Sequence, residues 1–241
     1  MLRKRLTKSD KPCCIVYGGS FDPVHLGHIM LPIQILRLYP KVFTKLIFVP
    51  SGNPPHKSRK LTDQEHRLEM LRLALFDKEN SLEVIEKESK EAMMSPSEIR
   101  GAFKRDFVGI AKEIFVIEDY EIQNSSRRNY TYQTLEYLAL EYPKYNLALL
   151  FGTDLASGHL EDFFSIWKNP DRIIELAEPL VMNRPGYELD NWHFSSVEVE
   201  PLDVSSTFLR EKLQQQEHDD LVKECIHPDV LEYIKTHRLY V

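Results

Sequence analysis

Short apolar runs alternate with helical patterns from one end of this chain to the other, and this alternation limits the folds available to it. Runs that are apolar at nearly every position are typical of strands covered on both faces. Strands separated by helices form a parallel sheet with helices packed on it. The sequence therefore predicts an α/β fold with strands at residues 13–17, 46–49, 114–117, 147–151 and 180–182, and two weaker candidates at 82–85 and 197–199.

Capping residues mark the starts of several helices. Capping boxes begin at Thr62 and Ser95, and Asn169 precedes a proline that suits the first helical position. In the helix expected after residue 28, Pro32 lacks the N–H that would bond the carbonyl four residues before it, so we expect a kink or irregular turn there. A chain of 241 residues that is 42% apolar fits a single domain spanning 1–241.

The charge balance and the cysteines argue against several classes of protein. The formal net charge is −6, from 31 Lys and Arg against 37 Asp and Glu, which disfavours a surface built for nucleic acid or for a membrane. An anionic ligand must therefore meet a local positive site. The three cysteines form no disulfide framework, and no run has the length of a signal peptide or a membrane span, so we expect a cytoplasmic protein. The sequence leaves the oligomeric state open.

The strongest functional signal is the run GGSFDPVHLGH at residues 18–28. Gly18 and Gly19 end a predicted strand, and residues without a Cβ let the backbone come close to a ligand. The helix that follows directs its free N–H groups and the positive end of its dipole at the same space, which favours a phosphate. His25 and His28 lie three residues apart and can reach one group. A zinc site made with the two adjacent cysteines is disfavoured, because neighbours on a strand point to opposite faces.

This run resembles the H-x-G-H signature of a nucleotidyltransferase superfamily, and most of the chain is similar to the bacterial nicotinate-nucleotide adenylyltransferases. The resemblance implies a Rossmann-like, doubly wound parallel sheet with flanking helices. It also implies that the two histidines are catalytic through charge stabilisation, with His28 at the α-phosphate of ATP and His25 at the adjoining phosphates. The loop residues implied to bind ATP are Gly18, Gly19, Ser20 and Phe21.

A second signature, VSSTFLR at residues 204–210, is similar to the family's I-S-S-T-x-I-R. Ser205 or Ser206 can cap a helix whose first N–H groups face an anion. Arg210 lies one turn later, where its guanidinium can reach the same phosphates. The resemblance implies that Ser206 and Thr207 bind ATP and that Arg210 is catalytic together with the histidines.

Four further stretches resemble family motifs: PPHK at 54–57, NYTYQTL at 129–135, GTD at 152–154 and NRPGY at 183–187. The resemblance implies ATP contacts from Gly152 and Asp154, with Asp154 at ribose hydroxyls. The residues implied to bind the mononucleotide are His56, Lys57, Thr131, Trp167 and Arg184. Trp167 lies farther behind Asp154 than the family's stacking tryptophan, so a half-buried place in the core is an alternative for it.

Residues 86–113 depart from the family pattern as an extra helical insertion, longer than the usual connection. An apolar stripe follows the capping box at Ser95, so this insertion is expected to pack on something. It could cover the active site, make an oligomer contact or be simple decoration.

The implied reaction is adenylyl transfer from ATP to nicotinate mononucleotide, which yields deamido-NAD and pyrophosphate for NAD biosynthesis. A Mg²⁺ ion bridging substrate phosphates is expected, with no metal site of the protein's own. The alternatives are another phosphate acceptor, such as nicotinamide mononucleotide or phosphopantetheine, and a non-catalytic nucleotide-binding regulator. A tRNA synthetase, whose first motif is similar, is disfavoured by the short, acidic chain.

Overall fold

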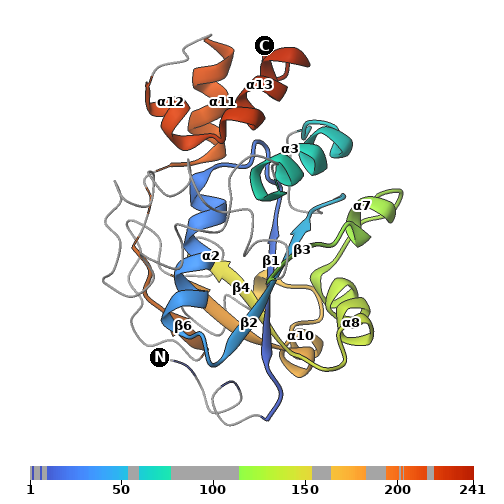
Figure 1. Cartoon of the computed structure of the whole chain (residues 1–241). Helices are drawn as coiled ribbons and strands as arrows, with labels where there is room; N and C mark the ends of the chain where they lie inside the picture. Colours follow the sequence, from blue (N-terminus) through green and yellow to red (C-terminus); the bar gives the residue numbers. More distant parts are fainter. Residues whose placement is uncertain are drawn as a thin grey trace. The chain divides into compact units, whose positions relative to one another are not determined.

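The structure is a computed structural model that describes residues 2, 6, 10–53, 60–76, 114–153, 164–182, 194–200, 202, 204–215 and 220–241. The strand expected at 82–85, the capping box at Ser95 and the insertion at 86–113 lie outside the described residues. In chain order the elements are β1 (Cys13–Gly19), α2 (Leu26–Leu38), β2 (Phe43–Pro50), α3 (Gln64–Phe76), β3 (Phe115–Ile117), α7 (Tyr120–Gln123), α8 (Thr131–Glu141), β4 (Asn146–Gly152), α10 (Pro170–Leu176), β5 (Ala177–Met182), β6 (Ser195–Val197), α11 (Ser206–Gln214), α12 (Asp220–Cys225) and α13 (Pro228–Thr236) (Figure 1).

The strands form one six-stranded sheet in the order β3-β2-β1-β4-β5-β6. β1 pairs in parallel with β2 on one side and with β4 on the other, and β4, β5 and β6 continue in parallel. The strand order therefore reverses between β1 and β4, as in a doubly wound sheet. This confirms the expected Rossmann-like α/β fold and the five clearest predicted strands.

Helices α8 and α10 cover one face of the sheet. Leu135 and Leu138 of α8 and Ile173 of α10 are buried against alternate residues of three central strands, namely Cys14, Val16, Ile47, Val49, Leu147, Leu149 and Phe151. Alternate residues share a face because successive side chains of a strand point in opposite directions. The residues between them, such as Ile15 and Leu150, are buried as well, so both faces are covered.

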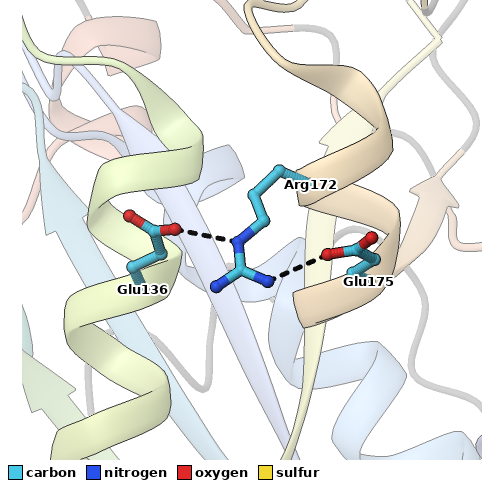
Figure 2. Close-up of polar contacts among 3 residues, drawn as sticks. All are labelled: Glu136, Arg172 and Glu175. Carbon is cyan, nitrogen blue, oxygen red and sulfur yellow. Dashed lines mark hydrogen bonds and ion pairs between the residues drawn. The ribbon is translucent and has the colours of Figure 1, made fainter.

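An arginine joins the two helices on this face. Arg172 of α10 donates to Glu136 of α8 from Nε at 2.8 Å and to Glu175 of α10 from Nη1 at 2.9 Å (Figure 2). All three side chains are largely exposed, and ion pairs in such positions add little to stability. The contact links α10 to α8, while the buried leucines and isoleucine hold the two helices on the sheet.

Two described helices begin close to the predicted positions, but Asn169 makes no side-chain capping bond and the N–H of Thr62 donates to Asp22. α3 begins at Gln64, and α10 begins at Pro170 directly after Asn169, whose φ of 52° is left-handed. α2 continues through Pro32 to Leu38, so no irregular turn interrupts the helix at the proline, and a kink there stays a prediction. The proline's missing N–H costs one bond, which the buried apolar side chains of this helix outweigh. No helix in the described part of the chain is long and apolar enough to cross a membrane.

The contacts divide the chain into two compact units, each built from several stretches of sequence. The sheet unit comprises Met1–Gly19, Pro32–Ser58 and Val116–Pro201, and the loop unit comprises Ser20–Leu31, Arg59–Phe115 and Leu202–Val241. The chain passes between the units repeatedly, so neither unit is a continuous segment. The single domain expected from the sequence stays a prediction.

Candidate active site

The loop unit gathers the two signature motifs around residues 20–23, which we call the phosphate loop. Its backbone is unusual, because Phe21 has a left-handed φ of 48°, which residues with a Cβ seldom adopt. Donors from α3 and α11 bond three of its carbonyl oxygens. Arg67 Nη1 donates to Ser20 O at 2.9 Å, Arg210 Nη1 to Asp22 O at 2.7 Å and Ser206 Oγ to Pro23 O at 3.0 Å. The loop is thus held by residues far away in the sequence.

The two histidines of the signature lie directly after this loop. His25 is buried just before α2, and the more exposed His28 lies in the first turn of the helix. Their ring centroids are 3.7 Å apart, and the edge of Phe21 packs on His28 at 5.2 Å. The spacing therefore does bring both imidazoles together, as predicted from positions three residues apart.

A backbone contact selects the tautomer of His28. The N–H of His25 donates to Nδ1 of His28 at 3.3 Å. A neutral imidazole that accepts at Nδ1 carries its proton on Nε2. Nε2 of His28 is therefore a donor, which is the role that an oxygen of a phosphate requires.

Helix α11 supplies the second signature. Its N-cap is Ser205, whose side chain accepts from the N–H of Phe208 at 3.2 Å. Ser206 does not cap the helix, because its hydroxyl donates to the phosphate loop. Arg210 also donates from Nη2 to Oγ1 of Thr207 at 3.0 Å. The serine, threonine and arginine of the signature are thus tied to the segment that carries the histidines.

The sheet unit holds the remaining described candidates. Gly18 and Gly19 end β1, and Gly152 ends β4 beside it, so these glycines lie at the carboxyl edge where the strand order reverses. Ligands of open α/β sheets bind at this edge. Ser51, which follows β2, bonds the carbonyl of Gly19 from both its N–H at 2.9 Å and its hydroxyl at 3.0 Å.

Thr131 and Trp167 also belong to the sheet unit. Thr131 is the first residue of α8. Trp167 is partly buried against the sheet core, and its ring lies 5.9 Å from that of Phe151 at 58°. This packing agrees with the alternative of a half-buried core aromatic, and stacking of Trp167 on a pyridine ring stays a prediction. His56, Lys57, Asp154 and Arg184 lie outside the described residues.

Reasoning from the sequence missed four supporting residues. In the loop unit these are Arg67, Asp22 and Tyr240, of which Arg67 and Asp22 are fully buried. In the sheet unit, buried Asn129 accepts at Oδ1 from the N–H of Asn53 at 2.8 Å, while its own N–H donates to Asn53 O. The charge of Arg67 does not single it out in the sequence, because α3 also carries Glu65, Glu69 and Arg72.

Comparison with known proteins agrees with this arrangement. Residues 16–212 match the family model described as Cytidylyltransferase-like. A probable nicotinate-nucleotide adenylyltransferase of Clostridium tetani is 31% identical over 239 residues, which is 93% of this chain and 97% of the relative. The nicotinate-nucleotide adenylyltransferase of Bacillus subtilis is 26% identical over 227 residues, covering 93% and 96%.

A solved structure shares the fold. Plasmodium falciparum nicotinic acid mononucleotide adenylyltransferase, complexed with NaAD, aligns with a TM-score of 0.66 at 22% identity, over 95% of this chain and 97% of that one. The identity is low, so this likeness speaks for the fold. The identity to the clostridial relative, along nearly the whole length of both chains, places this protein in the Cytidylyltransferase-like family, among the nicotinate-nucleotide adenylyltransferases.

Proposed function

We propose that this enzyme transfers the adenylyl group of ATP to nicotinate mononucleotide, forming deamido-NAD and pyrophosphate. The observation that carries the proposal is the grouping of His25, His28, Ser206 and Arg210 around the phosphate loop, in a chain whose relatives are named for this reaction. The structural neighbours complexed with NaAD and with APC support nucleotide substrates.

The reaction needs little covalent chemistry from the protein. An oxygen of the acceptor's phosphate attacks the α-phosphorus of ATP, the bond to the bridging oxygen breaks, and pyrophosphate leaves with the electron pair. The attacking phosphate is already anionic, so no strong base is required, and rate enhancement comes from positioning and charge stabilisation. We assign the Nε2–H of His28 to an α-phosphate oxygen, and His25 and Arg210 to the adjoining phosphates.

The remaining roles belong to the same proposal. Gly18, Gly19, Ser20, Phe21, Ser206, Thr207, Gly152 and Asp154 are proposed to bind ATP. The mononucleotide is assigned to His56, Lys57, Thr131, Trp167 and Arg184. The cytoplasmic location expected from the sequence likewise stays a prediction.

A divalent metal is part of the proposal as a companion of the substrates. Among the residues that the structure describes, no group of three or more His, Cys, Asp or Glu side chains could hold a metal ion. The carboxylate of Asp22, the acidic group of the phosphate loop, bonds Tyr240 and Thr62. We propose, as the sequence led us to expect, that Mg²⁺ would be held by substrate phosphates and water and would neutralise charge on the leaving group.

The test is pyrophosphate release from ATP and Mg²⁺ with nicotinate mononucleotide, nicotinamide mononucleotide and phosphopantetheine as parallel acceptors. A kcat/KM for nicotinate mononucleotide that is much higher than for the other two acceptors supports the proposal. A higher kcat/KM with another acceptor moves the substrate and keeps the chemistry. ATP binding without release of pyrophosphate in the presence of any of the three acceptors favours a nucleotide-binding regulator instead.

A histidine variant tests the assigned role of His28. Removing one donor that acts mainly in the transition state lowers kcat by about 10²–10³-fold while the KM for ATP changes little. We expect this from His28→Ala in steady-state assays. His237→Ala, which changes an exposed histidine at the end of α13, is the control and should keep normal turnover. Normal turnover in His28→Ala would remove His28 from the mechanism.

A further inference from the structure

The side chain of Asp22 lies fully buried beneath the phosphate loop and has a partner from the far end of the chain. Its Oδ1 accepts from the hydroxyl of Tyr240 at 2.7 Å, and its Oδ2 accepts from the N–H of Thr62 at 3.4 Å. The carbonyl of the same residue accepts from Arg210. Asp22 is therefore held through its side chain and its backbone at once.

The Asp22–Tyr240 contact has a residue with left-handed backbone at one end and next to the other. Phe21, next to Asp22, has a φ of 48°, and Tyr240 itself has a φ of 61°. Left-handed conformations in residues with a Cβ persist when the surrounding contacts over-determine them, and they concentrate at functional sites. Arg238 in the same turn also has a left-handed φ of 51°, and the bond from Tyr240 to Asp22 is one of the contacts that hold this turn.

The hydroxyl of Tyr240 is suited to a permanent donor role. Burial raises the pKa of Tyr240 above its usual value, and repulsion from the carboxylate of Asp22 raises it further. Tyr240 thus stays protonated and donates throughout the pH range in which the enzyme would work. A short bond from a hydroxyl to a buried oxygen of a carboxylate is among the stronger hydrogen bonds in proteins.

We propose that Tyr240 is a positioning residue for adenylyl transfer, whose bond to Asp22 holds the phosphate loop so that His25 and His28 meet the transferring phosphate. This inference rests on the proposed function for the chemistry and on the hydrogen bonds of the loop unit for the geometry. His25 follows Asp22 by three residues, and Arg210 bonds the carbonyl of Asp22. If Asp22 moves, the backbone between them moves His25, and the hydrogen bond to its carbonyl moves Arg210.

The test compares Tyr240→Phe with Tyr233→Phe. Tyr233 lies in the same C-terminal segment, but its hydroxyl bonds Nδ1 of His66 at 2.9 Å and not a residue of the phosphate loop. Displacements well below 1 Å in a reacting group lower turnover by about tenfold, so we expect kcat to fall about tenfold in Tyr240→Phe, with the KM for ATP within about twofold. Tyr233→Phe should keep kcat within about twofold of the wild type. A Tyr240→Phe enzyme with normal kcat overturns the proposal, even if it melts at a lower temperature.

A double-mutant cycle tests whether Tyr240 acts through Asp22. Asp22→Asn keeps an acceptor oxygen but lacks the negative charge, so it weakens the same contact from the other side. If the two residues act as one unit, Tyr240→Phe should lower kcat little further once Asp22→Asn is present. Equal effects of Tyr240→Phe in both backgrounds would overturn a role through Asp22.

Hydrogen exchange separates this inference from the proposed function. The amides of the phosphate loop should exchange faster in Tyr240→Phe than in the wild type, and at the wild-type rate in Tyr233→Phe. If the wild type forms no dinucleotide with any acceptor, the proposed function fails and the exchange rates alone decide. Faster exchange then supports the positioning contact, and unchanged exchange overturns it.

Discussion

A methyl group added at Gly27 tests how closely the first histidine is fitted to its helix. Gly27 lies in the first turn of α2, and a Cβ there would meet Cε1 of His25 at 3.1 Å, Nδ1 of His25 at 3.2 Å and Cγ1 of Val204 at 3.2 Å. Carbon atoms pack at about 3.5–4.0 Å, so the buried ring of His25 must retreat by about 0.4 Å. The ring of His28 lies 3.7 Å from it, so the imidazole pair moves as well.

Two opposing effects set the stability of Gly27→Ala. Alanine is favoured over glycine inside a helix by about 1 kcal/mol. Overpacking a buried site costs about 1–3 kcal/mol. The free energy of unfolding should therefore fall by no more than about 2 kcal/mol, and the variant should fold. A misplacement of 1 Å can cost about a hundredfold in rate, so 0.4 Å predicts a fall in kcat of about five- to tenfold.

Pyrophosphate release and thermal unfolding, measured on the same preparations, separate the two effects. The control makes the same change in a His25→Ala enzyme. This enzyme lacks the ring that the added methyl group would meet, so only the contact with Val204 remains. There, Gly27→Ala should change kcat by less than about twofold. An unchanged kcat in the single variant, or an equal loss in both backgrounds, would refute the steric argument.

Two further predictions concern stability. A Cβ on Gly52 would lie 2.0 Å from Glu121 O, so Gly52→Ala should lower the free energy of unfolding by about 3 kcal/mol or more, whereas Gly18→Ala, whose Cβ would come no nearer than 4.0 Å to Val49 O, should leave the melting temperature almost unchanged. Burial, followed by repulsion from Glu118, raises the pKa of Tyr142 above its ordinary value. As the pH rises, the hydroxyl of Tyr142 therefore loses its proton in the unfolded chain before it does so in the folded protein. The free energy of unfolding should then fall as the pH rises above about 10. Thermal melts from pH 8 to 11 should show this loss, with a shallower slope in Tyr142→Phe; an equal slope would exclude Tyr142 as a cause.

The sequence predicted the parts of the fold that depend on neighbours along the chain. Apolar runs identified the central strands because those strands are buried on both faces. For β5 and the edge strand β6 the same criterion misplaced the ends of the strands. β5 begins at Ala177 and not at residue 180, and β6 runs Ser195–Val197 and not 197–199, because buried Glu178 accepts a hydrogen bond from Ser195 Oγ at 2.9 Å. Glu178 and Ser195 are polar, so they interrupt the apolar runs from which strands were predicted, although their hydrogen bond allows both to be buried.

In the candidate site, too, the residues that lie together in the sequence could be predicted, and the contacts between distant residues could not. The glycines, the histidines and the serine-arginine signature could be predicted because they lie in short motifs of the sequence. Asp22 and Tyr240 are 218 positions apart, and Arg67 bonds the loop 47 positions away, so these contacts exist only after the tertiary structure forms. The choice between Ser205 and Ser206 as N-cap was equally open, since it depends on the phosphate loop claiming the hydroxyl of Ser206.

The supporting residues also explain how an acidic chain can receive a polyphosphate. The net charge of −6 opposes an anion at long range, so the attraction must be local. Backbone carbonyls would add to the repulsion, since their oxygens carry partial negative charge. In the phosphate loop, the carbonyls of Ser20 and Asp22 accept from the guanidinium groups of Arg67 and Arg210, of which Arg67 is fully buried. Two guanidinium charges thus lie beside the loop against the single carboxylate of Asp22, so the local charge favours an anion although the net charge of the protein does not.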